Sequence, residues 1–375
     1  MTECMSNLLG QCYAYIQAIS NTPIRPDYRR QLLQVSLKKG AQATTAIEGN
    51  TLSEDEIEVI VRGEKLPPSK EYLEKEVTNI LKAFNTILEE LTKKNEVMTL
   101  SSDVIKRFQH MVGDGIGETF ASSPGHFRRN NVIVGNYRPP SFEKIDDLID
   151  KLCTWLLKHF HYTTGQNFNE IIIQAIVTHI YIAWIHPFSD GNGRTARLLE
   201  FYLLLRAGVP DIASHILSNH YNETRAEYYL QLQQATETGS LTNFINYALQ
   251  GFRDGLEEVL QVIHKSQIDM TWRNYVHDII NTLQEEGKSS KTVYRIRQLA
   301  FHIPNDRFVA IPEIKITNEK IYTCYKKLSD ATLSRDLQIL TEKNILERKK
   351  NMFRAKKEVL HSFFPTVRSN ITRSW

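Results

Sequence analysis

The chain has few of the residues that mark a disulfide-bonded or zinc-binding protein. Only four of its 375 residues are cysteines, and no two of them form a Cys-x-x-Cys pair. Its twelve histidines include no His-Glu-x-x-His sequence. We therefore expect neither a disulfide framework nor a zinc site of these kinds.

A strong excess of charge of one sign is also missing. The chain has 46 Lys and Arg against 43 Asp and Glu, and its net charge of +3 is too small to indicate nucleic acid or membrane surfaces by itself. No basic flank precedes an apolar stretch near the N-terminus, and the apolar run 171–185 contains Gln174, Thr178 and His179. We therefore expect no secretory signal, no membrane span and a cytoplasmic location.

The composition that remains is that of a globular protein with a sizeable core. Hydrophobic residues make up 41% and charged residues 24% of the chain. The length favours two or three domains, and the periodicity is mainly helical. We predict an N-terminal helical region over residues 1–100, a core over 101–255 and a C-terminal domain over 268–360.

One segment gathers residue types that suit a nucleotide polyphosphate. Residues 186–197 read His-Pro-Phe-Ser-Asp-Gly-Asn-Gly-Arg-Thr-Ala-Arg. The apolar run 171–185 before them predicts a buried helix, and residues 194–207 have apolar residues at helical spacing with Gly208 as a stop. The segment is therefore predicted to be a loop that faces the N-terminus of the second helix.

Such a loop can bind phosphate and move a proton. Gly191 and Gly193 allow backbone turns that direct N–H groups at an anion, and the positive end of the following helix favours the same position. Arg194 and Arg197 share a helix face from which they can grip separate phosphates. His186, with an ordinary pKa of about 6.5, can accept a hydroxyl proton.

Each of these features has an ordinary interpretation when it stands alone. The histidine could be a helix cap, Gly-Asn-Gly a plain turn, and the two arginines a solvated face. Their occurrence together within twelve residues favours a site.

Residues 186–197 resemble the Fic motif, His-Pro-Phe-x-Asp/Glu-Gly-Asn-Gly-Arg-x-x-Arg, at every defined position. The resemblance implies a Fic-type helical core that transfers AMP from ATP to a Ser, Thr or Tyr hydroxyl of a target protein. It implies that His186 is the general base and that Asp190 is the ligand of Mg²⁺, which typically binds through one or two carboxylates plus phosphates. The nucleotide-binding residues that it implies here are Asp190, Gly191, Asn192, Gly193, Arg194, Thr195, Ala196 and Arg197.

Within that set the resemblance assigns separate roles. Asn192 and the glycine amides would form the anion hole, Arg194 would hold the α- and β-phosphates, and Arg197 the γ-phosphate.

Residues 44–50, Thr-Thr-Ala-Ile-Glu-Gly-Asn, resemble the inhibitory motif of the same family, Ser/Thr-x-x-x-Glu-Gly/Asn. The resemblance implies that Glu48 pairs with Arg197 and displaces the γ-phosphate from its productive position. An exposed carboxylate in the last turn of a helix costs roughly 0.3–1 kcal/mol, which a basic partner would offset. The alternative is a solvated glutamate at an ordinary helix end.

The surroundings of Glu48 predict where its helix ends. Residues 31–47 read as a helix with Gly49 as its C-cap, and Ser53-x-x-Glu56 reads as a capping box that opens the next helix.

Residues 131–140, Asn-Val-Ile-Val-Gly-Asn-Tyr-Arg-Pro-Pro, predict a β-hairpin in a helical chain. They resemble the family's flap, whose edge adds a strand of the target by main-chain hydrogen bonds. The residues implied at the nucleotide are Val132, Ile133, Val134 and Gly135. A plain surface hairpin is the alternative.

Tyr228 and Tyr229 follow the signature and resemble the family segment that borders the adenosine. Without the resemblance they would be interpreted as core residues of an amphipathic helix. Thr236 stands where the family's asparagine is expected, so the chain departs from the pattern at that wall of the pocket.

The C-terminal part resembles a winged-helix module. Residues 320–328 and 332–340 predict a helix-turn-helix, and residues 344–346 with the basic stretch 348–357 predict a wing. Such a module could bind duplex DNA, or serve protein docking or dimerisation.

These patterns together predict an autoinhibited protein adenylyltransferase that uses ATP and Mg²⁺. It would act on hydroxyl-bearing target proteins, and itself can be one of them. The alternatives on the same fold are removal of AMP, with Glu48 activating water, and Doc-like phosphotransfer, whose signature departs from Gly-Asn-Gly. A nucleotide-sensing DNA-binding regulator is a further alternative. The apolar faces of the N-terminal helices permit a homodimer, and the target protein is left open.

Overall fold

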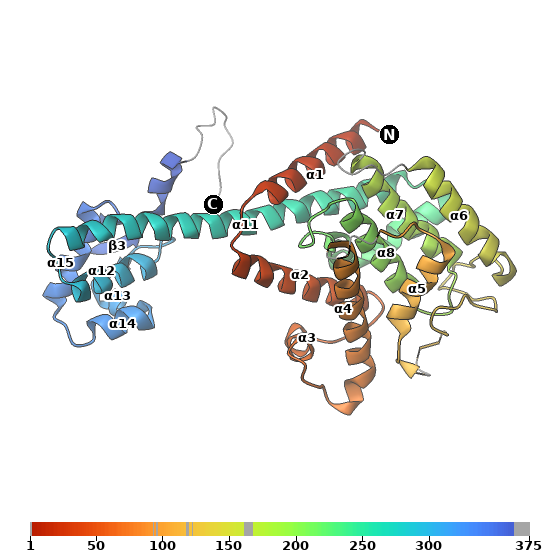
Figure 1. Cartoon of the computed structure of the whole chain (residues 1–375), viewed down its shortest axis with the longest axis horizontal. Coiled ribbons are helices and arrows are strands. Elements are labelled where there is room, and N and C mark those ends of the chain that lie inside the picture. The colour runs from red at the N-terminus through yellow and green to blue at the C-terminus, as the bar shows by residue number, and fades with distance from the viewer. Residues whose placement is uncertain are drawn as a thin grey trace. The chain divides into compact units, whose positions relative to one another are not determined.

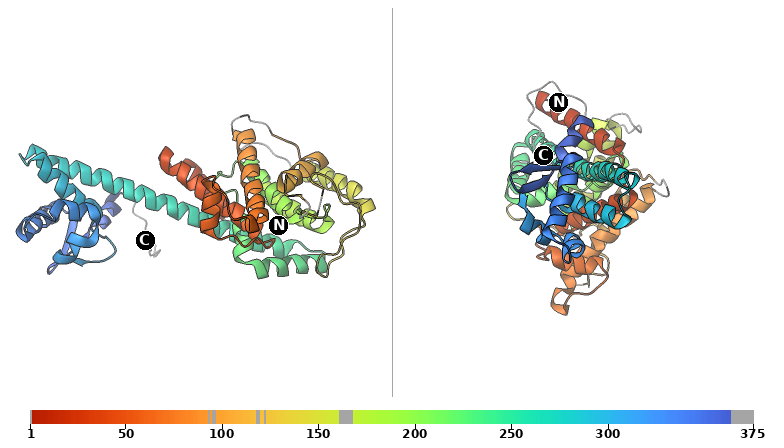
Figure 2. Two further views of the ribbon diagram at one scale, coloured as in Figure 1. Left: turned by 90° about the horizontal axis from the view of Figure 1, so that it is seen from below. Right: turned by 90° about the vertical axis from the view of Figure 1, so that its left-hand side faces the viewer.

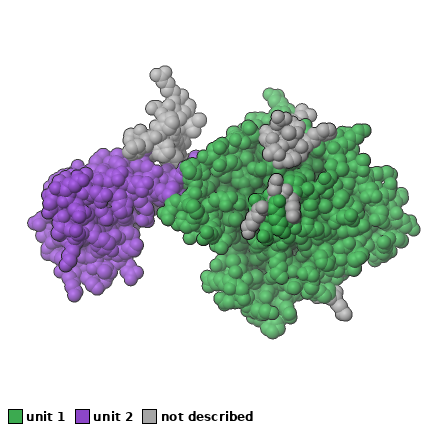
Figure 3. All heavy atoms as spheres, viewed as in Figure 1, with its two compact units in different colours: residues 1–263 green, residues 264–375 purple. Residues whose placement is uncertain are grey.

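The computed structural model describes residues 2–363, apart from residues 93, 95–96, 118–119, 122 and 161–167. It divides into two compact units, residues 1–263 and residues 264–375 (Figure 3). The predicted N-terminal region and the predicted core both lie within unit 1. The long helix α11, Thr242–Glu285, supplies its first half to unit 1 and its second half to unit 2.

Unit 1 is built from helices, which confirms the mainly α fold class (Figure 1). Its elements before α11 are α1 Glu3–Asn21, α2 Pro26–Ala46, α3 Glu54–Val61, η1 Pro68–Lys70, α4 Glu71–Thr92, α5 Ser102–Gly113, η3 Phe142–Lys144, α6 Ile145–His159, α7 Phe168–Ile185, α8 Asn192–Arg206, α9 Ile216–Glu223 and α10 Arg225–Thr238.

The helices α7 and α8 pack along each other at the centre of unit 1. α7 is apolar on almost every face, which is typical of a helix surrounded by protein. It has the length and hydropathy of a membrane span, but 61% of it is buried inside unit 1, as expected of a core helix. α8 is buried on all sides as well, although it carries Arg194, Arg197 and Glu200.

The end of α2 is set by local sequence. Gly49 has a φ of +100°, a conformation that glycine adopts without strain, and it terminates the helix as predicted. Ser53 and Glu56 form the predicted capping box at the start of α3. α2 begins at Pro26, earlier than the predicted residue 31, because proline is well suited to the first position of a helix.

The flap is smaller than the hairpin predicted for residues 131–140. Among the described residues of this segment, one bridge joins Val134 and Tyr137, through two backbone hydrogen bonds of 2.9 Å. Pro139 and Pro140 have no N–H to donate, so the pairing cannot continue regularly on that side. The predicted hairpin is therefore reduced to an exposed tight turn closed by one antiparallel bridge.

Unit 2 combines short helices with a three-stranded sheet of order β1-β3-β2, in which both strand pairs are antiparallel. Its helices pack with the second half of α11 around one apolar core (Figure 2). Its other elements are α12 Ser290–His302, β1 Val309–Ala310, α13 Ile311–Thr317, α14 Glu319–Tyr325, α15 Asp330–Glu342, β2 Leu346–Lys349, β3 Met352–Ala355 and η4 Lys357–Phe363.

The second predicted helix of the helix-turn-helix, residues 332–340, lies within α15, and the predicted wing corresponds to the hairpin β2–β3. Part of the basic charge expected on DNA phosphates is engaged inside the unit. Arg354 pairs with Glu347 and Glu358, and Lys357 pairs with Asp269. The winged-helix identity, DNA binding and a homodimer stay predictions.

A buried aspartate, Asp336, allows the packing of unit 2 to be tested. Asp336 is buried and accepts hydrogen bonds from Arg295 at 2.6 Å and from the Tyr325 hydroxyl at 2.8 Å. Asp336→Ala leaves both donors without their acceptor, so it should lower the opening free energy of α12, α14 and α15 by about 3 kcal/mol. Hydrogen exchange measured by mass spectrometry on the full chain would show this loss, with unit 1 unchanged.

The matched control is Asp330→Ala, because the Asp330 side chain is exposed and pairs with Lys315 at the surface. It should change protection by less than about 1 kcal/mol. Equal effects of the two variants would contradict the structural role given to Asp336.

Candidate functional site

His186 follows directly after α7 and turns out of the helix. Its amide donates to the Ile182 carbonyl at 2.9 Å, which closes the last turn, and its φ of +47° then redirects the chain. A positive φ is unusual for a residue with a side chain and persists where neighbouring contacts enforce it. The backbone at His186 is therefore held in place by its surroundings.

Arg128 provides that restraint. Its buried guanidinium donates to the carbonyls of His186 at 2.8 Å, Asn130 at 2.7 Å and Pro140 at 2.6 Å, and its amide donates to the Pro187 carbonyl at 2.9 Å. One side chain thus ties both ends of the flap to the residue after α7. This role of Arg128 was not predicted, since nothing in one sequence shows which carbonyls an arginine will reach.

The surroundings of His186 favour its neutral form. Burial lowers the pKa of His186 below its ordinary value, and the charge of Arg128 acts in the same direction. The carboxylates of Glu48 and Asp190 oppose this effect but do not reverse it. A neutral imidazole near pH 7 is the form that can accept a proton.

The loop between α7 and α8 is fastened by Asn192. Its side-chain amide donates to the Phe188 carbonyl at 2.8 Å, and its side-chain oxygen accepts from the Phe188 amide at 2.9 Å. The side chain is buried, so it shapes the loop instead of facing an anion. The role in an anion hole expected for Asn192 is thereby restricted to its backbone amide.

The first turn of α8 supplies free backbone donors. Gly191, with a φ of +80°, is the N-cap, so Asn192, Gly193 and Arg194 occupy the positions whose amides have no acceptor within the helix. The Thr195 amide already donates to the Gly191 carbonyl at 2.9 Å.

The side chains of Thr195 and Ala196 are fully buried in the core of unit 1. Their side chains pack α8 into the core, and their contact with a nucleotide stays a prediction.

Arg194 is paired with two carboxylates. Its Nη1 contacts Glu76 of α4, and its Nη2 lies 2.8 Å from Asp190 Oδ1. Burial alone would lower the pKa of Arg194, but the carboxylates of Glu76 and Asp190 outweigh it and raise the pKa. Glu76 was missed from the sequence, because it looks like any glutamate of an amphipathic helix.

Arg197 meets Glu48, the partner that the resemblance implied. Its Nη2 lies 2.6 Å from Glu48 Oε1 and donates to the Thr44 carbonyl at 2.9 Å. Burial would raise the pKa of Glu48, but the guanidinium of Arg197 outweighs this and lowers it, so the carboxylate is charged. The Arg197 side chain is wholly buried, whereas that of Glu48 is 32% exposed.

The carboxylate of Glu48 lies directly against Gly193. A Cβ atom added to Gly193 would come within 2.1 Å of Glu48 Oε1. Glu48 therefore occupies the space beside the free amides of α8, where a bound anion is most favoured.

The site has unused capacity for a phosphorylated ligand and its metal. In the part of the chain that the structure describes, Arg197 Nε and Nη1 and Arg194 Nε are buried donors without an acceptor. No group of three or more metal-ligating side chains occurs among the described residues. Asp190, whose side chain is 27% exposed, fits Mg²⁺ bound by one carboxylate together with substrate phosphates.

The other predicted contacts divide between surface and core. On the flap, Ile133 is 66% exposed and Val134 is also exposed. Tyr229 is exposed and donates to the Ile47 carbonyl at 3.2 Å. Tyr228 is buried and bonds to His179 at 2.9 Å, as expected of a core residue, and its place on the adenosine wall stays a prediction.

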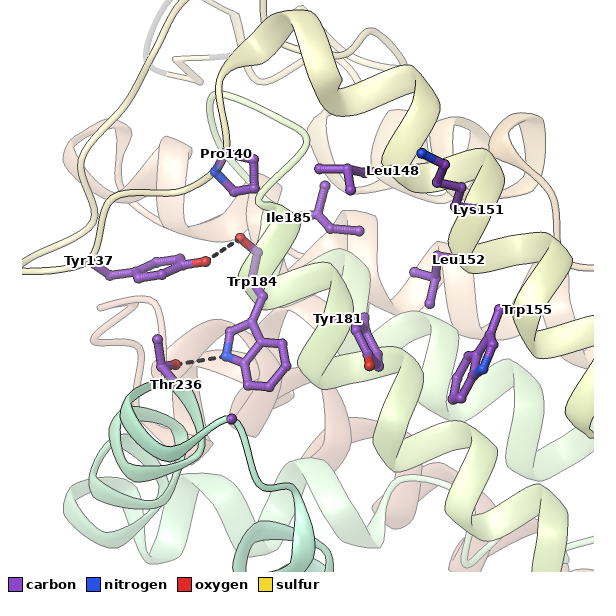
Figure 4. A pocket seen from close by; sticks show the side chains of 11 residues that line it. Tyr137, Pro140, Leu148, Lys151, Leu152, Trp155, Tyr181, Trp184, Ile185 and Thr236 are labelled. Atoms are coloured by element: carbon purple, nitrogen blue, oxygen red, sulfur yellow. Dashed lines mark hydrogen bonds between the residues drawn. The ribbon is translucent and has the colours of Figure 1, made fainter.

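An apolar pocket of about 630 Å³ lies between the flap, α6, α7 and the end of α10 (Figure 4). The polar groups at its flap end are paired within the wall: Tyr137 donates to the Trp184 carbonyl at 2.9 Å, and Trp184 donates to Thr236 at 2.7 Å. Thr236 thus fixes an aromatic wall of the pocket. The lining residues are Tyr137, Pro140, Leu148, Lys151, Leu152, Trp155, Tyr181, Trp184, Ile185, Thr236 and Gly239.

The contact between Glu48 and Gly193 can be tested without any assay of activity. Gly193→Ala should displace the Glu48 carboxylate and leave Arg197 unpaired, which should lower the unfolding free energy by about 1–3 kcal/mol. In a Glu48→Gly background, Gly193→Ala should lower the unfolding free energy by clearly less. Urea unfolding of the four proteins in this double-mutant cycle gives the coupling energy, and additive costs would contradict the contact.

Comparison with known proteins identifies similar sequences and similar folds. Residues 99–204 match the sequence model of the Fic/DOC family. The chain is 31% identical over 205 residues to protein adenylyltransferase Fic of Nematostella vectensis, covering 54% of this chain and 44% of the relative. It is 31% identical over 208 residues to protein adenylyltransferase fic-1 of Caenorhabditis elegans, covering 54% and 37%. The chain therefore spans less than half the length of these curated relatives.

Solved structures show the same fold. A Fic family protein from Desulfovibrio desulfuricans superposes with a TM-score of 0.58 at 17% identity, covering 95% of this chain and 96% of that one. Fic-1 from C. elegans superposes with a TM-score of 0.58 at 24% identity, covering 70% and 73%. The signature loop 186–197 lies within residues 99–204, the segment that is similar to the Fic/DOC family.

Proposed function

We propose that this chain is an autoinhibited protein adenylyltransferase, which moves AMP from ATP to a hydroxyl of a target protein. The observation that carries the proposal is the charged Glu48 carboxylate, which pairs with Arg197 against Gly193 at the start of α8. The naming of its relatives as adenylyltransferases supports the same chemistry.

The residues of the loop can perform the transfer. The triphosphate lies along the free amides of α8, with Arg194 and Arg197 as its side-chain donors. Mg²⁺ held by Asp190 supplies charge neutralisation for the phosphates when it is bound. His186 accepts the proton of the target hydroxyl, the oxygen forms a bond to the α-phosphorus, and the bond from that phosphorus to the β-phosphate's bridging oxygen breaks to release pyrophosphate.

The same geometry supports inhibition by Glu48. Phosphoryl transfer depends on positioning and on charge stabilisation, and both are disturbed when a carboxylate holds the arginine meant for the γ-phosphate. A nucleotide that binds while Glu48 stays in place is pushed from the position in which its α-phosphorus faces the hydroxyl. The partial exposure of Glu48 allows it to leave without opening the core.

The alternative reactions differ in which phosphate of labelled ATP they would attach to protein. A phosphotransferase would attach the γ-phosphate, although Gly191-Asn192-Gly193 is intact here. Removal of AMP would use the charged Glu48 to activate water, and a nucleotide sensor would attach neither label. In phosphotransfer and in removal of AMP, a target strand added to the exposed flap would meet His186.

Removing the inhibitory carboxylate tests the proposal directly. Glu48→Gly incubated with Mg²⁺ and ATP should incorporate α-phosphate label into itself at least about tenfold faster than wild type, because a 1.4 kcal/mol change in barrier suffices for tenfold. The γ-label should not be retained. Glu64→Gly, an exposed glutamate beyond α3, is the matched control and should behave as wild type. Retention of the γ-label, or of neither label, would contradict adenylylation.

The base can be removed in the same background. His186→Ala added to Glu48→Gly should reduce α-label incorporation by about 10²–10⁴-fold, which is the range for a general base. Nucleotide binding measured by calorimetry should persist, since His186 does not hold the phosphates. Near-normal incorporation would show that another group accepts the proton.

The pH profile follows from the lowered pKa of His186. Below its pKa the imidazole is protonated and cannot act as a base, so transfer falls as the solution becomes more acidic. Because the pKa lies below the ordinary value of about 6.5, the acid limb of kcat/KM should have its midpoint below pH 6.5. A midpoint clearly above pH 7 in the Glu48→Gly variant would contradict the assignment.

A further inference from the structure

We infer that Glu76 is a positioning residue for Arg194, and that its charge opposes nucleotide binding while its contact favours transfer. This inference rests on the function proposed above and assigns a role to a side chain outside the signature. Glu76 belongs to α4, one of the N-terminal helices, and lies 118 positions before Arg194 in sequence.

Glu76 is fixed from both sides. It is only 4% exposed, and one of its oxygens contacts Arg194 Nη1. The other oxygen accepts from Asn50 Nδ2 at 3.0 Å. Asn50 also donates to the Leu73 carbonyl at 3.0 Å and accepts from the Leu52 amide at 3.1 Å, so the whole amide is engaged.

This support restricts the guanidinium of Arg194 to one orientation. Glu76 and Asp190 hold two of its nitrogens, and the ring of Phe120 lies 5.5 Å from its central carbon. Its buried Nε has no acceptor among the described residues. A free arginine side chain has many rotamers, so a guanidinium fixed in advance loses less conformational entropy on meeting a phosphate.

Glu76 also changes the charge of the site. Three carboxylates, those of Glu48, Glu76 and Asp190, surround the two guanidinium groups of Arg194 and Arg197, so this cluster is net negative. Glu48 is partly exposed and can leave, whereas Glu76 is buried and stays. A polyanionic nucleotide therefore meets the repulsion of Glu76 in every state of the enzyme.

Binding and transfer should then respond oppositely to loss of this charge. Glu76→Gln keeps the size of the side chain and removes its charge, so the affinity for nucleotide should rise severalfold. The weaker contact releases Arg194 from its fixed orientation, so the transfer step should slow. A residue that only stabilised the fold would not separate the two quantities.

The experiment compares Glu48→Gly with Glu48→Gly/Glu76→Gln. Calorimetry with Mg²⁺ and ADP should give an increase in affinity of about threefold or more, whereas kcat for α-label incorporation should fall about tenfold. Glu71→Gln, an exposed glutamate at the start of the same helix, is the matched control and should change neither quantity.

Asn50→Ala in the same background separates position from charge. It removes the support of Glu76 but keeps its negative charge, so kcat should fall without any gain in affinity for ADP. The inference is overturned if Glu76→Gln leaves both quantities unchanged, or if it weakens ADP binding together with kcat.

The ADP affinity and the α-label incorporation test this inference and the proposed function separately. If Glu48→Gly incorporates no α-label, adenylylation fails. The ADP affinities of the Glu76 and Asn50 variants are still measured, and an affinity gain confined to Glu76→Gln supports the electrostatic role. Unchanged affinity in both variants rejects it.

Discussion

The structure of unit 1 depends on the burial of two guanidinium groups in its central helix. Arg194 and Arg197 lie on α8, which is surrounded by other helices, and a buried charge without a partner costs several kcal/mol. Their partners come from outside α8: Glu76 from α4 and Glu48 from the end of α2. The N-terminal helices therefore supply the carboxylates that pair with the two arginines of α8.

The two carboxylates have the same chemistry and different freedom. Glu48 ends a helix, borders Gly49 and is partly exposed, so it can be displaced with little disturbance of the core. Glu76 lies in the second turn of α4 and is held by Asn50. A removable carboxylate suits regulation and a fixed one suits positioning, and the structure assigns one of each to the neighbouring arginines.

Much of this could be predicted from the sequence because it is encoded locally. A few adjacent residues determine each of three features: the helices on either side of residues 186–191, the C-cap at Gly49 and the capping box at Ser53. The predicted pairing of Glu48 with Arg197 came from resemblance alone.

The remaining features depend on contacts between distant segments. Glu76 lies 118 positions from Arg194, and Arg128 lies 58 positions from the carbonyl of His186 that it binds. The flap forms one antiparallel bridge before its two prolines, and Tyr228 lies in the core, where its hydroxyl bonds to the buried His179. Thr195 and Ala196 match the motif, and their side chains are buried in the core of unit 1.

The central claim is that Glu48 and the γ-phosphate compete for Arg197. Crystal structures of the wild type and of Glu48→Gly with Mg²⁺ and a non-hydrolysable ATP analogue test it most directly. We predict that in the variant the γ-phosphate lies on Arg197 and the α-phosphorus faces His186, whereas in the wild type the Glu48–Arg197 pair persists and the phosphates are displaced. A wild-type complex with the γ-phosphate on Arg197 and Glu48 still paired to it would contradict the account.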